Sequence, residues 1–434
     1  MDLRKTTEGL SYMERKTLAE GISLTTLGDG RYVCNRISVN LCFPRSEEAS
    51  AQGAMLSYLL RRGSERYPGF APLNRKLYDL YGAYYDCTLA TLGGCQVLSL
   101  AVQTIDEAFA WKREKINGEL ADFLCDMLLR PNAPGGAFLP DEVAVEQKNL
   151  CEEIDSEINN KRAYALGRSR EILHVGTPLA GSRLGTKEAV LALDGAALYR
   201  ALQRLLESAQ VEILCSGRGD FSGAAEVFAR QLGGLPPRPA AFSLPPLPST
   251  EGPVEVEEAL SVTQSKLVLS FLPARRFAPG QYGAVRAAVA LFGGAPFSRL
   301  FANVREKQSL CYYCDARFNR VTGVLTVDCG LDEKDVPRAE ESIRRELAEL
   351  AAGNFTDEEL QDAKAYLKNS MTAMEDSLAE LDPWYLGQVL EGDAQSPQAA
   401  AAQIEAATRE EVMAVCASFS QRLRYLLKPR QRAL

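Results

Sequence analysis

The sequence predicts an α+β protein of two homologous domains, each a mainly antiparallel sheet with helices packed on one face, together forming a clamshell. Three observations predict this: the length of 434 residues, a proline-rich segment near the middle, and an order of elements that occurs twice. A chain of this length exceeds one ordinary domain, and two domains of about 200 residues can each bury a core. We place an N-terminal domain at residues 1–233, a linker at 234–252 and a C-terminal domain at 253–434.

The linker is predicted from its prolines. Residues 235–248 read LPPRPAAFSLPPLP and contain six prolines. Proline removes a backbone donor and fixes φ, so this run excludes both a helix and a central strand. We expect an extended connection here.

The repeat is an order of strand, helix, helix, strand, strand in each half. A long, charged stretch with helical periodicity closes each block, and Thr356 followed by Glu359 predicts a capping box in the second of these stretches. The strand-like runs are residues 36–44, 84–90 and 95–103 in the first half and 266–273, 311–318 and 323–331 in the second; the closing stretches are 139–168 and 333–376.

Composition narrows the class of protein. The chain is 46% hydrophobic and 24% charged, with a formal net charge of -8. Nucleic acid and anionic membranes both attract clustered Lys and Arg, so neither is expected as a main partner. The first forty residues contain no continuous apolar stretch typical of a secretory signal, and no apolar run approaches the ~20 residues that cross a bilayer. We expect a cytoplasmic protein.

The eleven cysteines are odd in number and irregularly spaced, which does not indicate a disulfide framework. Cys42, Cys95 and Cys215 lie in strand-like apolar runs and are predicted to be buried thiols. Cys311 and Cys314 form a C-x-x-C, which is typical of a redox pair or half of a zinc site; the simpler interpretation is two thiols of one strand.

Residues 291–313, LFGGAPFSRLFANVREKQSLCYY, resemble the second domain of the insulinase/pitrilysin peptidases, with Arg305 and Tyr312 at that family's Arg and Tyr. Residues 53–68 are similar to the segment that carries the family's zinc helix, an inverted H-x-x-E-H. The sequence of residues 76–88, KLYDLYGAYYDCT, resembles that of a zinc-less branch of this family, which is found in Bacillus-type bacteria and paired with a zinc-bearing sister. The resemblance covers nearly the whole chain.

The zinc site of that family is absent from this sequence. When residues 53–68 are aligned on Gly63, the two metal-binding histidines of the family fall on Ala54 and Tyr58, and its general-base Glu falls on Ser57. A catalytic zinc of this kind needs two imidazoles and a carboxylate. The chain contains one histidine, His174, which is predicted to end a helix, so no cofactor is expected here.

The family's third zinc ligand is a Glu on a later helix, and the resemblance implies Glu153 as its relict. Glu146 and Glu153 are seven residues apart, which places both carboxylates on one helix face. The alternative interpretation is a solvated acidic helix without any metal role.

The resemblance implies that Arg305 and Tyr312 stabilise the transition state of peptide hydrolysis in trans, at the zinc of a partner chain. From the residues alone, the alternative is that Arg305 is an ion-pairing surface residue beside Glu306 and that Tyr312 is a strand aromatic. Tyr313 takes the role of Tyr312 if the register shifts by one.

Peptide capture in the family uses an exposed strand edge to which an extended peptide adds. By resemblance, residues 93–102 are the equivalent segment; the alternative is a core strand. The predicted peptide-binding residues are Gly93, Gly94, Cys95, Gln96 and Val97.

Three functional hypotheses follow. The first is a subunit that is inactive alone and supports peptide cleavage by a zinc-bearing sister in a heterodimer. The second is a structural or peptide-binding protein of the same fold without catalysis. The third, a homodimeric enzyme with unrelated chemistry, ranks last because we find no complete nucleophile or metal set in the sequence.

Overall fold

The computed structural model describes residues 12–111, 114–236, 244–248, 252–392 and 394–430. They form two compact units, and neither unit is a contiguous half of the chain. The first unit takes its described residues from 1–154, 181–243 and 378–390; the second takes them from 155–180, 244–377 and 391–434.

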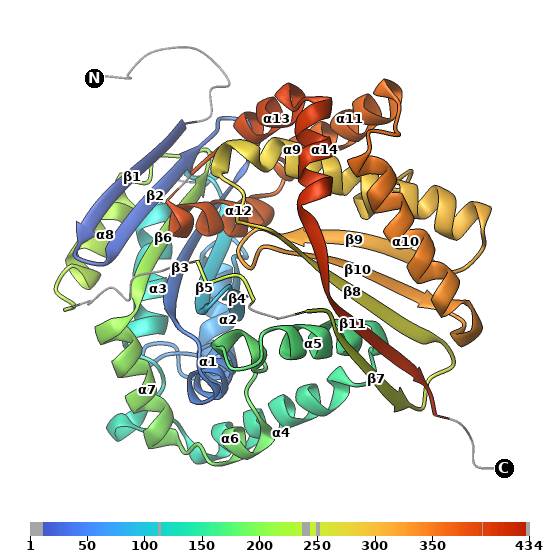
Figure 1. The fold of residues 1–434 in the computed structure, drawn as a ribbon. Coiled ribbons are helices and arrows are strands. Elements are labelled where there is room, and N and C mark those ends of the chain that lie inside the picture. The colour runs from blue at the N-terminus through green and yellow to red at the C-terminus, as the bar shows by residue number, and fades with distance from the viewer. Residues whose placement is uncertain (1–11, 112–113, 237–243, 249–251, 393, 431–434) are drawn as a thin grey trace. The chain divides into compact units, whose positions relative to one another are not determined.

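The first unit is built on a six-stranded sheet with the order β1-β2-β6-β3-β5-β4 (Figure 1). Strands β2 and β6 are parallel, and the other neighbouring pairs are antiparallel. The strands are β1 (Tyr12–Ala19), β2 (Ile22–Gly28), β3 (Cys34–Pro44), β4 (Tyr84–Leu92), β5 (Cys95–Ile105) and β6 (Gln210–Gly217).

The second unit is built on a five-stranded sheet with the order β7-β11-β8-β10-β9. Its β7 and β11 are parallel and its other pairs antiparallel. The strands are β7 (Val254–Leu260), β8 (Ser265–Pro273), β9 (Tyr313–Asn319), β10 (Val324–Leu331) and β11 (Phe419–Pro429).

The two sheets repeat one topology. Strands β2, β6, β3, β5 and β4 occupy the same order as β7, β11, β8, β10 and β9, and the single parallel pair has the same place in each. The repeated order predicted from the sequence and the mainly antiparallel α+β class are therefore confirmed.

Except for the last of them, the helices of the first unit bury the apolar face of its sheet. Inward residues of β3, such as Ile37, Val39 and Leu41, join Met55 and Phe123 in one core. The helices are α1 (Glu47–Leu59), α2 (Phe70–Asp79), α3 (Ile116–Leu129), most of α4 (Pro140–Glu157), α6 (Lys187–Leu191), α7 (Gly195–Ser208), α8 (Ser222–Leu232) and most of α12 (Leu378–Glu391), with 3-10 turns η1 (Glu107–Phe109) and η2 (Pro134–Gly136).

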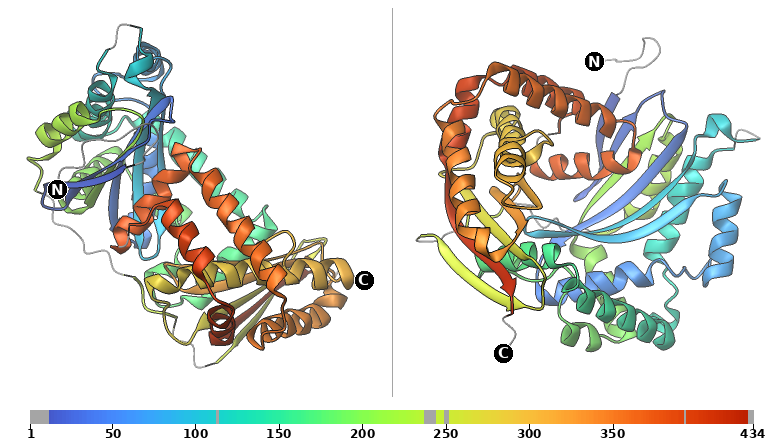
Figure 2. Two further views of the ribbon diagram at one scale, coloured as in Figure 1. Left: turned by 90° about the horizontal axis from the view of Figure 1, so that it is seen from above. Right: turned by 90° about the vertical axis from the view of Figure 1, so that its right-hand side faces the viewer.

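The second unit has its own core, in which Leu269 of β8 and Val327 of β10 meet Ile343 and Phe292. Figure 2 shows the sheets and their helices from two further directions. The helices are α5 (Lys161–Leu173), α9 (Tyr282–Val289), α10 (Val336–Ala351), α11 (Asp357–Met374), α13 (Pro397–Ala406) and α14 (Arg409–Ser418), the π-helices η5 (Ala290–Gly294) and η6 (Leu300–Lys307), and the 3-10 turns η3 (Pro178–Ala180), η4 (Pro279–Gln281) and η7 (Glu333–Asp335).

Each unit contains one helix from the other half of the sequence. The predicted domains, 1–233 and 253–434, were contiguous and did not include this exchange. Helix α5 packs in the second unit, where Ala165 and Leu173 contact a cluster with Val268 and Tyr425. These strand residues alternate with those of the main core, so α5 covers the opposite face of the sheet. The prediction had placed helices on one face only.

Helix α12 is the reciprocal case, because it packs in the first unit. Its Asp382 carboxylate accepts a hydrogen bond of 2.7 Å from Nε of Arg36 on β3. In the second unit Arg162 of α5 binds Asp328 of β10 at 2.5 Å. Each exchanged helix is thus held to its sheet by an Arg–Asp pair.

Local signals at the helix ends agree with the sequence. Thr356 and Glu359 form the predicted capping box of α11. His174 is the C-cap residue of α5, as predicted. Each long charged stretch contains a break that was not predicted: Asn160 separates α4 from α5 and caps α5, and Gly353, with φ of 81°, follows α10.

The predicted linker lies partly outside the described residues, because 237–243 and 249–251 are not described. Residues 244–248 contain neither helix nor strand. The carbonyl of Pro245 accepts a hydrogen bond from Arg276, and Leu247 packs beside the α5 cluster. Among the described helices, none is long and apolar enough to cross a membrane.

We predict that Arg36→Met lowers the free energy of unfolding by about 3 kcal/mol at neutral pH, because it leaves a buried carboxylate without its cation. Burial raises the pKa of Asp382, while Arg36 opposes this. A raised carboxyl pKa in the folded state means that stability falls as pH rises toward that pKa. Without Arg36 the pKa rises further, so the deficit should be larger at about pH 8 than at about pH 5.

Urea unfolding at both pH values measures this deficit. The double variant Arg36→Met/Asp382→Asn is the control, and it should recover part of the lost stability because the uncompensated charge is gone. A deficit that is independent of pH and additive in the double variant would contradict the role of this pair.

Candidate functional site

Helix α1 carries the three positions that correspond to the zinc helix. Ser46 caps the helix by accepting a hydrogen bond from the backbone N–H of Ala49. Ala54 is buried in the core, and Tyr58 lies one turn later on the same face. The hydroxyl of Ser57 donates to the backbone oxygen of Ala54 at 2.8 Å, so it is engaged inside the helix.

The structure brings Tyr58 and Glu153 together, although 95 residues separate them in sequence. The phenol of Tyr58 donates a hydrogen bond to Oε2 of Glu153, and Nη2 of Arg183 binds the other oxygen, Oε1, at 2.9 Å. Burial, and then the hydrogen bond to Glu153, raises the pKa of Tyr58 to about 12. Tyr58 is therefore a neutral donor at physiological pH.

Glu146 is the second carboxylate of this face, and it is also paired. Nη1 of Arg62 forms an ion pair with its Oε1, and Nδ2 of Asn149 donates to its Oε2 at 2.8 Å. Arg61 lies with its Cζ 4.6 Å from the ring centroid of Tyr58. Both glutamates of the predicted pair thus have arginine partners.

These residues do not fit a zinc ion. Tyr58, Arg61, Arg62 and Glu146 help to line a pocket of about 440 Å³, and none of the residues lining it offers an imidazole. The guanidinium groups on the carboxylates would repel a divalent cation. Among the residues that the structure describes, no group of three or more His, Cys, Asp or Glu is placed to hold a metal. The position of the family's general base is held by Ser57, whose hydroxyl is engaged within α1.

Arg305 lies in the second unit, on the π-helix η6. Its Nε is 3.6 Å from Oε1 of Glu306, and its Cζ lies 4.7 Å from the ring centroid of Phe301. Its side chain is 41% exposed, so the Glu306 pair leaves the guanidinium accessible to a ligand.

Tyr312 lies directly before β9, and its position is set by the sheet. Its backbone N–H donates to the oxygen of Gly330 at 2.8 Å, while its hydroxyl is 3.4 Å from Oδ1 of Asp332. The residue is 55% exposed. Neither Arg305 nor Tyr312 is needed to fill the core of its own unit.

Close packing requires the glycine at position 293, in the π-helix η5 that precedes η6. A Cβ at Gly293 would lie 2.7 Å from the Cβ of Ala316 on β9, which is closer than side chains allow. Gly293 therefore lets the π-helices η5 and η6 approach the strand that follows Tyr312. Ser309 has a φ of 50°, so the chain makes a left-handed turn between η6 and β9.

Tyr313, the alternative to Tyr312, lies inside the second unit. Arg162 of α5 and Lys266 lie 4.2 and 5.3 Å from its ring centroid. Burial raises its pKa. Its packing against α5 gives it a structural role, whereas Tyr312 is the exposed tyrosine of the two.

The structure differs from the predicted peptide-binding edge. Gly93 and Gly94 form the turn between β4 and β5, and Cys95, Gln96 and Val97 begin β5. Strand β5 is hydrogen-bonded to β3 on one side and β4 on the other, so its backbone offers no edge. The edge of this sheet on that side is β4, which contacts α1.

Sequence reasoning missed the arginine partners of the two glutamates. Arg62 directly precedes Gly63, at the basic position of the degenerate zinc motif, which is a signal that could have been used. Arg183 lies in a loop 30 residues after Glu153, and its sequence surroundings contain no signal for this contact.

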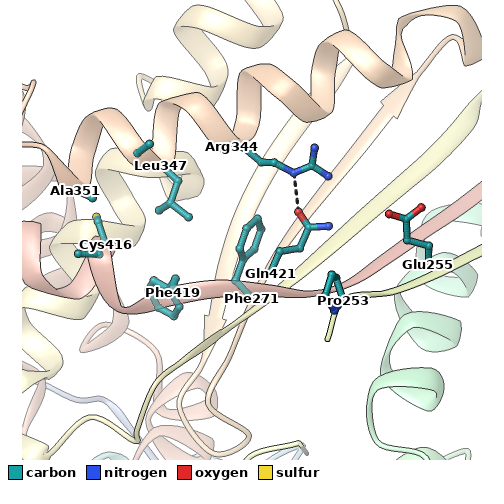
Figure 3. Close-up of a pocket in the computed structure, with 11 residues that line it drawn as sticks. Pro253, Glu255, Phe271, Arg344, Leu347, Ala351, Cys416, Phe419 and Gln421 are labelled. Carbon is teal, nitrogen blue, oxygen red and sulfur yellow. Dashed lines mark hydrogen bonds between the residues drawn. The ribbon is translucent and has the colours of Figure 1, made fainter. Parts of the chain in front are cut away.

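A separate pocket of about 530 Å³ lies in the second unit beside α10 and the start of β11 (Figure 3). Phe271, Leu347 and Phe419 line its apolar part, and Nε of Arg344 donates to Gln421 at 2.8 Å on its polar side. Burial raises the pKa of Cys416 to about 12, so this thiol is a poor nucleophile. The pocket does not include Arg305 or Tyr312.

Comparison with known proteins gives three concordant findings. Residues 192–367 match the family described as peptidase M16 inactive domain. The chain is 23% identical over 428 residues to the probable inactive metalloprotease YmfF of Bacillus subtilis, which covers 96% of this chain and 99% of that protein.

Solved structures share the fold. A conserved protein from Enterococcus faecalis V583 superposes with a TM-score of 0.88 at 24% identity, covering 97% of this chain and 100% of that one. A peptidase M16 inactive domain from Pseudomonas fluorescens gives 0.78 at 18% identity, with 97% and 99% covered. The resemblance stated from the sequence is confirmed.

We predict that Glu153→Ala lowers the free energy of unfolding by about 1 kcal/mol, because Tyr58 and Arg183 lose their acceptor at a partly exposed site. Glu152→Ala is the matched control on the same helix. The Glu152 carboxylate is 67% exposed and 3.9 Å from Lys148, so its removal should change stability by less than about 0.5 kcal/mol. If urea unfolding gave the same loss of stability for both variants, Glu153 would be an ordinary solvated carboxylate without a structural role.

We also predict that the purified chain contains less than stoichiometric zinc and that a chelator leaves its melting temperature unchanged, because arginines already neutralise the carboxylates. Metal analysis and thermal unfolding with and without EDTA measure this. One zinc per chain, lost together with stability in EDTA, would overturn the description of the site.

Proposed function

Because this chain is a homologue of the inactive M16 peptidases, we propose that it is the non-zinc-binding subunit of a two-chain peptidase, and that Arg305 and Tyr312 act on a peptide bound to a zinc-bearing sister. The observation that carries the proposal is a contrast within one chain. Where the family holds zinc, this chain pairs Glu146 with Arg62 and Glu153 with Arg183. Arg305 and Tyr312 are instead exposed, in η6 and directly before β9.

The chemistry assigned to the pair follows from peptide hydrolysis. Attack on the scissile carbonyl places negative charge on its oxygen, and donors held at that oxygen stabilise the transition state. A guanidinium remains charged at all physiological pH values and a phenol donates one hydrogen bond. In the proposed complex the partner supplies zinc and the general base, and this chain supplies these two donors.

A second candidate function is peptide binding without catalysis. Strand β4 is an edge strand with the exposed Tyr84, and an extended peptide can add to such an edge by backbone hydrogen bonds. In this case the contacts of Arg305 with Glu306 and Phe301 are those of an ordinary surface residue.

The test is to purify the chain together with a zinc-bearing sister and to measure kcat/KM on a peptide library. We expect Arg305→Ala to lower kcat/KM by about 100-fold and Tyr312→Phe by about 10-fold, because each removes a transition-state donor. Peptide affinity, measured on the complex with zinc removed, should change much less.

Matched controls are Arg338→Ala, an arginine whose side chain is 67% exposed in the same unit, and Tyr78→Phe, a residue that is 78% exposed. Both should keep kcat/KM within about twofold. Full activity in the Arg305 and Tyr312 variants would overturn the subunit role. If peptide binding then persisted, the second function would remain.

A further inference from the structure

Three thiols meet where η6 leads into β9. Cys314 of β9 and Cys329 of β10 are directly opposite in the antiparallel register, and their Sγ atoms lie 2.9 Å apart. Cys311 precedes β9 and packs against the core cluster that contains both of these thiols. The C-x-x-C of the sequence is therefore one part of a three-thiol cluster, whose third member is 15 residues further on.

The three thiols differ in access to solvent. Cys314 and Cys329 are 3% and 1% exposed and belong to the apolar core of the second unit. Cys311 is half-buried at the edge of this core. A small oxidant from solvent would therefore meet Cys311 first.

The surroundings of Cys311 favour its thiolate. The hydrogen bond from Cys314 lowers the pKa of Cys311 most, burial opposes this, and the positive charge of Arg305 adds to the lowering. The same hydrogen bond, and then that with Cys329, raises the pKa of Cys314, which stays protonated. Burial raises the pKa of Cys95, a half-buried cysteine of the first unit.

We propose that Cys311, Cys314 and Cys329 form a peroxide-reactive thiol centre, in which Cys311 is oxidised first and Cys314 captures it as a disulfide. The Cys311 thiolate attacks one oxygen of hydrogen peroxide, the O–O bond breaks, and a sulfenic acid and hydroxide form. The sulfur of Cys314 then attacks the sulfenic sulfur; hydroxide leaves with a proton as water. In total two thiols and one peroxide give one disulfide and two waters.

The third thiol extends this chemistry. Cys329 is in contact with Cys314, and the hydrogen bond between them lowers the pKa of Cys329, but burial and nearby negative charge together outweigh it and raise that pKa. Its thiol therefore passes its proton to the leaving Cys311 sulfur as it attacks Cys314, which moves the disulfide to Cys314–Cys329 and leaves Cys311 as a thiol. This exchange consumes no further oxidant. The cluster can therefore hold the oxidised state in the core while Cys311 becomes reduced again.

Oxidation has a local structural consequence. Tyr312 lies between Cys311 and Cys314, so a disulfide between them closes a small ring that contains it. The thiol chemistry depends only on the cluster and Arg305, not on the proposed peptidase role. If the peptidase role were disproved, the thiol centre would still be tested by the oxidation experiment below, and the reverse also holds.

The experiment uses the reduced full-length chain and hydrogen peroxide, followed by alkylation of remaining thiols and peptide mapping without reductant. We expect the loss of two thiols per chain, a disulfide that involves Cys314, and recovery of both thiols with dithiothreitol. In the untreated protein Cys311 should react with iodoacetamide about tenfold faster than Cys95, its half-buried control, at about pH 7.5.

Variants assign the order of events. Cys311→Ser should form no disulfide at this cluster, Cys314→Ser should stop at a sulfenic acid on Cys311 that dimedone traps, and Arg305→Ala should slow the oxidation of Cys311 severalfold. Cys416→Ser, which removes a buried thiol of the same unit, should leave the reaction unchanged.

Two results would overturn the proposal: disulfide formation at an unchanged rate in Cys311→Ser, or alkylation of Cys311 no faster than that of Cys95 in the unmodified chain. The second measurement needs no variant, so it decides the question even if Cys311→Ser does not fold. Either result would mean that the three sulfurs are only packed together in the core.

Discussion

Four buried carboxylates and the half-buried Glu153 are paired with arginines, and the candidate site and the two exchanged helices both depend on this pairing. Removing a carboxylate from water costs several kcal/mol unless a cation and hydrogen bonds accompany it. For Glu146 and Glu153, at the positions that correspond to the family's zinc site, the cation is an arginine guanidinium and not a metal. The pairs are Arg62–Glu146, Arg183–Glu153, Arg36–Asp382, Arg162–Asp328 and Arg15–Glu212.

The two groups of residues that the family resemblance singles out therefore differ in this chain. On α1, Ala54, Ser57 and Tyr58 stand where the family's two histidines and general base align, whereas Arg305 and Tyr312 lie at the surface of the second unit. An exposed arginine and tyrosine gain a function only when another molecule places a substrate beside them. The partner-dependent proposal rests on this need, and Cys311 gives the same segment a chemistry of its own.

Much of the fold could be predicted because its signals are local. The strand and helix order, the Thr356 capping box and the end of α5 at His174 follow from propensity and hydrogen bonding within a few residues. The exchange of α5 and α12 could not be predicted, because periodicity indicates that a helix has an apolar face but not which sheet that face covers. The choice between an edge strand and a core strand for residues 95–97 stayed open for the same reason, since strand neighbours are set by topology; the structure has the core strand.

The sequence by itself determined that the chain cannot assemble a two-histidine zinc centre, because it contains one histidine, and no fold can supply a missing ligand. It also determined the α+β class and the repeat, because these depend on the order of elements. Only the tertiary structure decided which cations neutralise Glu146 and Glu153 and that Cys329 joins Cys311 and Cys314. Those contacts join residues distant in sequence, and their formation depends on the packing of whole strands and helices.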